Sequence, residues 1–272
     1  MKKTPFEKTA LFNVSIKIFE NEYTAIAGHT GSGKSTLIQI MSGLIKPTSG
    51  SVSIDEVGLY SDDKKSVHNA RLKVGIVFQY PETQLFEETV EKDISFGPKN
   101  LGLDEVEIQN RVRHSMEIVD LPYGELKDVS PLKLSGGQQR RVAIAGVLAM
   151  NPKYLILDEP TAGLDPHARE ELMQKIKSLH DKKNVTPVLI THNMDDIAKY
   201  AQRMIVLSQG KILIDDVPRK VFNSVDVLNI AGLALPSATQ LLRELNSKGL
   251  NIGNNAINVD ECEKFIKEFI NN

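Results

Sequence analysis

Residues 28–36 read Gly28-His29-Thr30-Gly31-Ser32-Gly33-Lys34-Ser35-Thr36, and this stretch decides the fold. It matches the phosphate-binding loop, in which two glycines bracket four residues and Lys and Ser or Thr follow. Glycine lets backbone N–H groups approach an anion because no Cβ stands in the way, and the helix after the loop points its N-terminus at the phosphates. The stretch predicts a nucleotide site in which Lys34 neutralises the terminal phosphates and Ser35 binds Mg²⁺.

The residues on either side of this loop have the order that the pattern requires. Tyr23 to Ala27 is an apolar run that favours a β-strand, and Thr36 to Gly43 has the composition of a helix. Strand, loop and helix in this order are the setting of a nucleotide-binding loop. The alternative, a glycine turn with a purely structural role, is weakened by this setting.

Composition and charge narrow the class of protein. The chain has 272 residues, of which 41% are hydrophobic, and its net charge is −2. This balance argues against a protein that coats nucleic acid through a basic face. The single cysteine, Cys262, excludes an internal disulfide, and the longest apolar stretch, Val142 to Met150, is about half of what spans a bilayer. We expect a cytosolic protein that acts on a membrane only through a partner.

Polar residues follow the strands that we expect in the core. Continuous apolar runs separated by helical segments predict strands covered on both faces, hence a mainly parallel sheet. Such sheets bind ligands at the carboxyl ends of their strands. Three runs end at polar residues: Lys73 to Phe78 before Gln79, Tyr154 to Leu157 before Asp158 and Glu159, and Pro187 to Thr191 before His192. We expect these side chains and the phosphate loop to share one edge of the sheet.

Two other segments predict antiparallel strands. Residues 11–18 alternate apolar and polar side chains after Phe12, as a strand with one solvated face does, and Phe12 itself is expected in the core. Met204 to Leu207 and Lys211 to Ile214 flank Ser208-Gln209-Gly210 and predict a hairpin. The predicted fold class is α/β, with a mainly parallel core sheet, an antiparallel β edge, a helical subdomain and a small C-terminal α-rich appendage.

The helical subdomain is expected at about residues 80–150, where the β signal disappears. Asp104 to Leu121 places Val112, Met116 and Val119 on one helical stripe. The subdomain ends in Leu134-Ser135-Gly136-Gly137-Gln138, where Ser135 suits the N-cap position and the two glycines expose a helix N-terminus. This second anion site lacks a lysine, so we interpret it as a half-site that a head-to-tail partner completes.

Residues 233–272 are predicted to form an appendage to a nucleotide-binding domain at residues 1–232. Asp260 with Glu263 predicts a helix N-terminus with a capping box. Apolar residues then recur with helical spacing on one face: Cys262, Phe265, Ile266, Phe269 and Ile270. This stripe either packs on its own domain or contacts another subunit, and the sequence leaves both alternatives open.

Three residues at the strand ends suit the chemistry of nucleotide hydrolysis. Asp158 can anchor Mg²⁺, and Glu159 stands where a base that activates the attacking water is needed. The alternative for Glu159 is a solvated glutamate at a strand end, and a lone histidine is more often structural than catalytic. At the end of a neighbouring strand, His192 becomes a candidate sensor of the terminal phosphate.

Together these motifs resemble those of the ATP-binding cassette ATPases, in that family's order and over about residues 11–220. The matching parts are the phosphate loop, Gln79, residues 134–138, Leu155-Ile156-Leu157-Asp158-Glu159-Pro160, Gly163-Leu164-Asp165 and His192. Further stretches resemble the CbiO/EcfA ATPases of energy-coupling factor transporters, the A-prime subunit most: residues 80–90 from Tyr80-Pro81-Glu82 to Thr89-Val90, residues 140–146 from Arg140-Arg141 to Gly146, and Leu235-Pro236.

The resemblance implies ATP and Mg²⁺ as cofactors and ATP hydrolysis coupled to transport. Glu159, His192 and Gln79 would be catalytic, and Ser35, Gln79 and Asp158 would bind the metal. Gln79 would also relay to the transport partner, and Asp165 would bridge two subunits. Residues 134–138 would complete the partner's ATP site, and the tail after Leu233 would dimerise.

The partners implied are a second cassette ATPase subunit, in a homodimer or heterodimer, a transmembrane coupling subunit and a substrate-binding membrane subunit. The complex would import vitamins or transition-metal ions, with this chain peripheral on the cytoplasmic side of the cell membrane. One alternative is a soluble cassette ATPase acting on nucleic acid or ribosomes, but a long coiled coil and a duplicated cassette are both missing. Another, a nucleotide sensor without turnover, conflicts with Glu159.

The chain differs from the family at its start. The family carries an aromatic residue that stacks on adenine just before the stretch matching Thr4-Pro5-Phe6-Glu7, and here Met1, Lys2 and Lys3 precede that stretch. Phe6 lies after the expected position. We therefore expect weaker stacking of the base on this chain.

Overall fold

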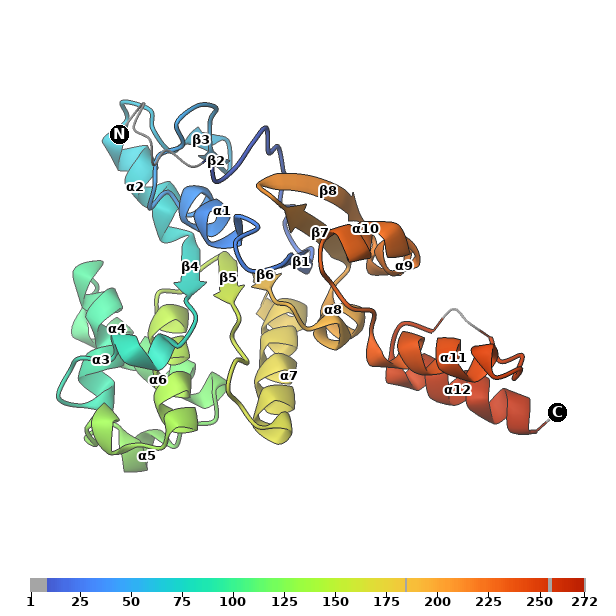
Figure 1. The fold of residues 1–272 in the computed structure, drawn as a ribbon. Coiled ribbons are helices and arrows are strands. Elements are labelled where there is room, and N and C mark those ends of the chain that lie inside the picture. Colours follow the sequence, from blue (N-terminus) through green and yellow to red (C-terminus); the bar gives the residue numbers. More distant parts are fainter. Residues whose placement is uncertain (1–8, 184, 254–255, 272) are drawn as a thin grey trace. The chain divides into compact units, whose positions relative to one another are not determined.

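The structure is a computed structural model that describes residues 9–183, 185–253 and 256–271. It divides into two compact units, Met1–Leu37 with Leu189–Asn272, and Ile38–Val188. Figure 1 shows the helices and strands of the chain. Helix α1 (Lys34–Met41) and strand β6 (Thr186–Ile190) each pass from one unit into the other. The proposed aromatic position at the start, including Phe6, lies outside the described residues.

The first unit contains a mixed sheet around strand β1 (Thr24–Ala27), in the order β6-β1-β7-β8. All four residues of β1 are buried, and β1 pairs in parallel with β7 (Arg203–Ser208). Strand β8 (Lys211–Asp216) is antiparallel to β7 and alternates exposed and half-buried residues, as an edge strand does. Gln209 and Gly210 both have positive φ, of 48° and 73°, as the tight turn of a hairpin needs. The predicted hairpin is confirmed.

Three short helices of the first unit cover a buried apolar cluster. They are α8 (Met194–Tyr200), α9 (Pro218–Asn223) and α10 (Val225–Ile230). Side chains from these helices and from β1 and β7 meet in it, among them Ile197, Phe222 and Leu228. Leu233 also packs in this cluster, so the segment that leads to the tail is fixed to the core beside the sheet.

The tail forms two helices, α11 (Ser237–Ser247) and α12 (Val259–Ile270), around a small apolar cluster that contains Leu242 and Cys262. The predicted capping box of Asp260 and Glu263 is wrong by two residues. Asn258 caps α12 and Glu261 accepts a hydrogen bond from the Ile257 amide at 3.1 Å, because Asn258 has the extended backbone of an N-cap and Asn caps as well as Asp.

Of the predicted apolar stripe of α12, Cys262, Phe265 and Ile266 pack inward. Phe269 and Ile270 are 39% and 73% exposed.

The second unit contains parallel strands β4 (Val74–Val77) and β5 (Tyr154–Asp158), followed in order by β6. The Thr186 amide donates to the Lys153 carbonyl at 2.8 Å. A separate antiparallel pair, β2 (Ser53–Ile54) and β3 (Val57–Gly58), packs with helix α2 (Lys64–Leu72). Helix α7 (Pro166–Lys183) follows β5. The mainly parallel sheet with antiparallel additions confirms the predicted fold class.

Helices occupy the stretch between Gln79 and Asp158, as predicted. They are η1 (Pro81–Gln84), α3 (Val90–Asn100), α4 (Glu105–Ile118), α5 (Tyr123–Leu126), η2 (Pro131–Lys133) and α6 (Gly136–Ala149). In Figure 1, α3, α4 and α6 lie side by side, and these three helices contact one another. Val112 and Met116 are fully buried, which confirms the apolar stripe of α4.

The strand predicted at residues 11–18 is wrong. Residues 14–18 alternate half-buried and exposed positions, but the segment bends at Phe12 and Asn13 and carries no strand pairing in the described residues. Alternating burial needs only an extended backbone with one covered side, whereas a strand needs a ladder of hydrogen bonds. The Phe12 amide bonds to the Gly210 carbonyl at 2.8 Å, and Arg203 donates to the Lys17 carbonyl. Phe12 is 58% exposed rather than in the core, and Lys211 lies over its ring.

Candidate functional site

The phosphate loop follows β1 in the first unit and leads directly into α1, so the strand, loop and helix are present as predicted. Its glycines have steric reasons to be there. A Cβ on Gly28 would lie 2.1 Å from the Leu207 carbonyl oxygen, and one on Gly33 would lie 2.8 Å from the Ala10 carbonyl oxygen. Gly31 and Gly33 also have φ of 82° and 108°. The loop therefore requires glycine at positions 28 and 33.

Polar groups inside this loop point to an anion site. Lys34 donates from Nζ to the carbonyls of Gly28 and His29 at 2.6 and 3.0 Å, so its ammonium lies over the loop. Ser32 is fully buried, and its hydroxyl has no hydrogen-bond partner among the described residues. A buried hydroxyl without a partner is unfavourable in itself. The loop has the donors and the charge that fit a phosphate chain.

His192 lies at the same edge of the sheet as the phosphate loop. It follows Thr191, whose amide donates to the carbonyl of Ile26 near the end of β1. His192 is exposed, and Asn193 after it caps α8 by accepting from the amides of Asp195 and Asp196. The cap fixes the chain direction directly after His192. The first unit thus brings the phosphate loop and His192 together.

In the second unit, Gln79 follows β4 and is exposed. Tyr80 after it has a left-handed backbone with φ of 56°, which turns the chain into the short helix η1. Glu82 in η1 forms an ion pair with Arg140 of α6 at 3.0 Å. Burial, the largest single effect, raises the pKa of the Glu82 carboxyl, but the hydrogen bonds from Arg140, a backbone hydrogen bond and the charge of Arg140 together hold that pKa below its ordinary value.

Asp158 ends β5, and the turn that follows begins at Glu159. Glu159 has φ of 49°, a strained conformation for a residue with a side chain, and such strain is frequent at functional sites. The Glu159 carbonyl accepts from the Ala162 amide at 3.1 Å, which closes the turn. Asp158 and Glu159 are both half-buried. The second unit therefore places Gln79, Asp158 and Glu159 at the carboxyl ends of neighbouring strands.

Asp165 has a structural role that the sequence analysis missed. Its carboxylate accepts from the amides of His167 and Ala168, both at 3.0 Å, and so caps helix α7. The hydrogen bond from the Ala168 amide, followed by that from His167, lowers the pKa of this carboxyl. The carboxylate is exposed.

Residues 134–138 lead into α6 with the predicted N-cap. The Ser135 side chain accepts from the Gln138 amide, and the Gln138 side chain accepts from the Ser135 amide, so the full capping box is formed. A Cβ on Gly136 or Gly137 would meet no atom within 4 Å. The helix N-terminus is thus open to an approaching group.

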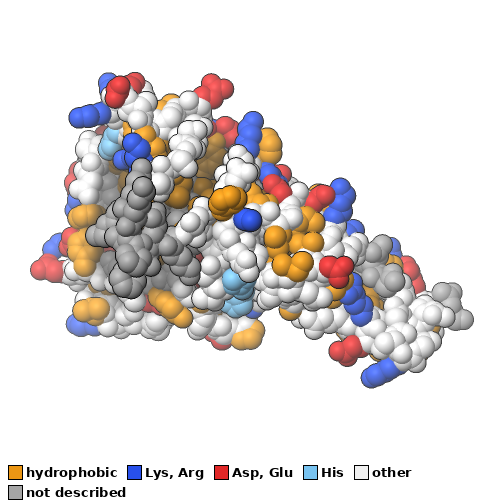
Figure 2. Space-filling view, turned by 45° about the horizontal axis from the view of Figure 1, so that its top comes forward, with side chains coloured by type: hydrophobic (Ala, Val, Ile, Leu, Met, Phe, Trp, Pro, Cys, Tyr) orange, Lys and Arg blue, Asp and Glu red, His pale blue; other side chains and the backbone are white. Residues whose placement is uncertain are grey.

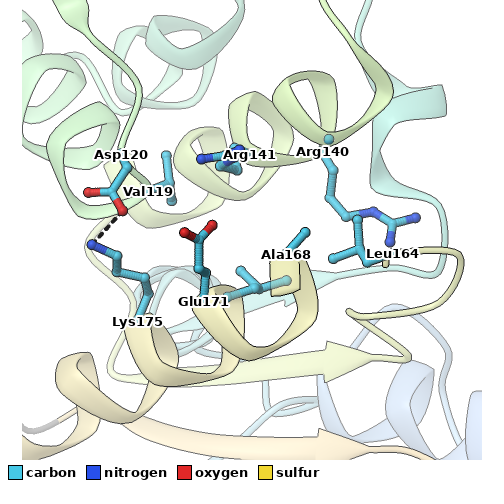
Figure 3. A pocket seen from close by; sticks show the side chains of 10 residues that line it. Val119, Asp120, Arg140, Arg141, Leu164, Ala168, Glu171 and Lys175 are labelled. Carbon is cyan, nitrogen blue, oxygen red and sulfur yellow. Dashed lines mark ion pairs between the residues drawn. The ribbon is translucent and has the colours of Figure 1, made fainter. Parts of the chain in front are cut away.

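A pocket of about 30 Å³ lies between α6 and α7 (Figure 3). Charged side chains of both signs line it, and Lys175 pairs with Asp120 at 2.6 Å. Figure 3 shows Glu171 and Arg141 on facing sides of it. A volume near that of one water molecule is too small for a nucleotide, and we assign no ligand to this pocket.

Sequence reasoning did not identify several contacts in the site region. The Glu82 and Arg140 pair, the cap at Asp165 and the buried Ser32 hydroxyl were missed. Arg140 gave no distinct local signal, since Gln138, Gln139 and Arg141 surround it in the polar first half of α6. The partners of such a charge come from distant parts of the chain, and one sequence does not show them.

Residues 11–162 match the family described as ABC transporter. The energy-coupling factor transporter ATP-binding protein EcfA2 of Clostridium tetani is 52% identical over 100% of this chain and 94% of its own length. The structure of CbiO1 from Clostridium perfringens, part of the ABC transporter complex CbiONQ, is similar with a TM-score of 0.72 and 39% identity, over 86% of this chain and 92% of that chain.

A dimeric post-hydrolysis structure of the ATP-binding cassette MJ0796, bound to ADP and phosphate, is similar with a TM-score of 0.70 and 33% identity, over 79% of this chain and 94% of that chain. The likeness to the EcfA2 protein extends over the whole chain, including the tail beyond the cassette motifs. The phosphate loop, the strand-end carboxylates and the capped glycine helix fit an ATPase of this kind. The chain belongs to the ABC transporter family, as an ATP-binding protein of the energy-coupling factor type.

Proposed function

We propose that this chain hydrolyses ATP as a subunit of an energy-coupling factor importer, and that ATP closes a head-to-tail dimer of two cassettes. The observation that carries the proposal is the phosphate loop, with Lys34 placed over it and the buried Ser32 hydroxyl inside it, which has no hydrogen-bond partner among the residues that the structure describes. The whole-length similarity to EcfA2 supports the transporter assignment.

Mg²⁺ would be held by Ser35, Gln79 and Asp158. These side chains offer a hydroxyl, an amide carbonyl and a carboxylate, all oxygen donors of the kind that Mg²⁺ prefers. When bound, the metal would neutralise charge on the terminal phosphates. Glu159 would accept the proton of the attacking water, and the turn that closes on its carbonyl holds it in place.

His192 would contact the terminal phosphate, since the cap at Asn193 fixes the backbone after it. Residues 134–138 would provide the glycine helix N-terminus for the ATP held by the partner cassette. Asp165 would reach the partner with the carboxylate oxygen that the cap of α7 leaves available, since both capping bonds use Oδ1. The MJ0796 cassette, a dimer bound to ADP and phosphate, is a precedent for a pair of cassettes that holds nucleotide.

The dimer would also be held through the tail. An apolar groove of about 440 Å³ lies between α11 and α12, lined by Leu241, Val259 and Ile266 among others. Leu241 and Val259 are 45% and 69% exposed, and Ile270 nearby on α12 is 73% exposed. Exposed apolar area of this kind favours a protein partner, here the tail of the second cassette.

A membrane subunit would dock beside Gln79. Phe86 and Phe96 are 64% and 45% exposed, and their rings meet edge to face at 5.0 Å. Tyr80 is 48% exposed. Aromatic side chains next to acids form a surface that suits a short helix with apolar anchors and a basic residue. None of the described helices combines the length and apolar character needed to cross a membrane.

We further propose a peripheral position on the cytoplasmic side of the membrane, and vitamins or transition-metal ions as the cargo. The alternative, an ATPase acting on nucleic acid, lacks support. On the face drawn in Figure 2, the described Lys and Arg side chains are interspersed with Asp and Glu and do not gather into a basic groove. The net charge of −2 agrees with this.

The test is ATP hydrolysis by the complex that co-purifies with this chain from detergent-solubilised membranes. We expect Mg²⁺-dependent turnover that Lys34→Ala abolishes together with nucleotide binding, because the substitution removes the charge that meets the terminal phosphates. Identification of the co-purifying chains would establish whether the second cassette is a copy of this one. A purified complex that binds ATP without hydrolysing it would contradict the proposal.

A further inference from the structure

Arg140 is a buried charge in helix α6, with 4% of its surface exposed. It lies five residues after Ser135, which caps the same helix. Burying a guanidinium is unfavourable unless its donors are satisfied. The hydrogen-bond partners of Arg140 therefore show which segments of the chain this side chain connects.

One side of the guanidinium is bound to the segment that follows Gln79. Arg140 donates from Nε to Glu82 Oε2 at 3.1 Å and from Nη2 to Glu82 Oε1 at 3.0 Å. This is a bidentate pair, the most strongly directional contact between arginine and a carboxylate. The Tyr80 ring lies 6.0 Å from the guanidinium carbon. Arg140 thus fixes the chain one and three residues after Gln79.

The other side of the guanidinium is bound to the turn that follows Glu159. Nη1 donates to the carbonyls of Pro160 and Ala162. Figure 3 shows the Arg140 side chain reaching from α6 toward the segment of Leu164. The same turn contains the strained backbone of Glu159, and strained residues need support from surrounding contacts.

We propose that Arg140 is a positioning residue for ATP hydrolysis, which holds the Gln79 segment and the Glu159 turn in register with the helix that begins at Ser135. The inference rests on the proposed function of Gln79 and Glu159. It adds that both are set through one side chain that touches neither nucleotide nor metal. A shift of about 1 Å in a catalytic group can lower a rate on the order of a hundredfold, so a link of this kind has a measurable effect.

Lysine cannot replace arginine in this role. Its single ammonium carries the charge but does not form a bidentate pair with Glu82 and reach two carbonyls at once. Arg140→Lys therefore keeps the charge and removes the link. Arg141→Lys is the matched control, because Arg141 is the next residue of the same helix and forms none of these hydrogen bonds within the described part of the chain.

The experiment measures turnover per bound ATP in the purified transporter complex. ATP binding is measured in a Glu159→Gln background, and turnover in the presence of the native glutamate. We expect Arg140→Lys to lower kcat about tenfold to a hundredfold while the Kd for ATP stays within about twofold. Arg141→Lys should leave both unchanged. A loss of folded protein would lower binding and turnover together, so the ratio separates positioning from stability.

A second variant tests the pair of Arg140 and Glu82 without altering the arginine. Glu82→Gln removes the charge of one partner and leaves Arg140 bound to the two carbonyls. We expect a smaller loss of kcat, and no further loss when Glu82→Gln is added to Arg140→Lys, because both changes break one link. The inference would be overturned if Arg140→Lys had the same turnover per bound ATP as Arg141→Lys. It would also be overturned if the losses of kcat in Glu82→Gln and Arg140→Lys multiplied in the double variant.

The result is independent of the test of the proposed function. If the parent complex hydrolyses ATP and Glu159→Gln abolishes turnover, the function stands whatever Arg140→Lys does. If the parent complex is inactive, the function fails first.

Discussion

Ser237 donates two hydrogen bonds to one carboxylate, that of Asp195, from its backbone amide at 2.8 Å and from its hydroxyl at 2.7 Å. Ser237 is the first residue of tail helix α11, and Asp195 lies in the first turn of α8, three residues after His192. A carboxylate near a helix N-terminus is stabilising, and here one serves the N-terminal ends of two helices. The tail is therefore tied to the helix that follows the proposed phosphate sensor.

Ser237→Ala should loosen the tail without unfolding the chain. The variant loses the hydroxyl bond and keeps the amide bond, an effect of about 1 kcal/mol or less at an exposed position. Hydrogen exchange should become faster at the start of α11 and remain unchanged in β7. Ser247→Ala is the control, since its hydroxyl donates to the Glu244 carbonyl at the other end of the same helix. Equal exchange in the two variants would show that Asp195 does not hold the tail.

The acid stability of the second unit should depend on Asp55. Hydrogen bonds from Lys73, Tyr154 and Lys153 hold the pKa of the Asp55 carboxyl far below its ordinary value, and these bonds outweigh the opposing effect of burial. A depressed pKa in the folded state means stability that is present above the unfolded pKa of about 3.9 and is lost as the pH falls toward the folded value.

Asp55→Asn should therefore lower the free energy of unfolding by about 1–3 kcal/mol at pH 7, since it removes charge-assisted hydrogen bonds. The difference from the parent should shrink as the pH falls below about 4. Denaturant unfolding at several pH values measures both. Asp62→Asn, at an exposed aspartate nearby, should have no effect. A difference that stays constant with pH would refute the role of the Asp55 charge.

Gly33→Ala should abolish ATP binding. The new Cβ would lie 2.8 Å from the Ala10 carbonyl oxygen and 2.9 Å from Leu11 Cδ2, and the φ of 108° is strained for alanine. Gly50→Ala is the matched control, because Gly50 has a φ of 87° but open space around it. Nucleotide titration should show binding in the Gly50 variant and none in the Gly33 variant. Normal affinity after Gly33→Ala would contradict the close approach described for the loop.

Contact with the membrane subunit should depend on Phe86, Glu87 and Glu88. Glu82 belongs to the same stretch, but its pairing with Arg140 inside the chain makes it unsuitable as a docking acid. Charge reversal at Glu87 and Glu88, combined with Phe86→Ala, should detach the membrane subunit on purification while ATP binding is retained. The control is charge reversal at Glu105 and Glu107, in the first turn of α4. Unchanged co-purification of the first variant would rule out this surface.

The sequence predicts the parts of the site that lie on local patterns. The phosphate loop, the cap at Ser135 and the strand ends at Gln79, Asp158 and His192 each follow from a few neighbouring residues. Contacts between distant residues are not predictable in this way. Arg140 and Glu82 are 58 positions apart, and Asp195 and Ser237 are 42 apart.

The predicted cap of α12 and the predicted strand at residues 11–18 are wrong because a local sequence pattern is compatible with more than one structure. At α12, Asn258 and Asp260 are both good caps, and the position of the apolar stripe alone does not decide between them. At residues 11–18, the alternation of apolar and polar residues matches the alternating burial of residues 14–18 but does not show whether a hydrogen-bonding neighbour is present. The alternation also does not show which side chains are covered, and Phe12 is exposed beside Lys211 rather than in the core.

Glu159→Gln tests the central claim most directly. The amide keeps the shape of the side chain but cannot accept the proton of the attacking water. In the purified complex we expect ATP binding at the parent affinity and turnover lower by about 10²- to 10⁴-fold, the range for loss of a general base. Turnover within about threefold of the parent, with ATP bound normally, would contradict the assignment of this chain as an ATPase that uses Glu159.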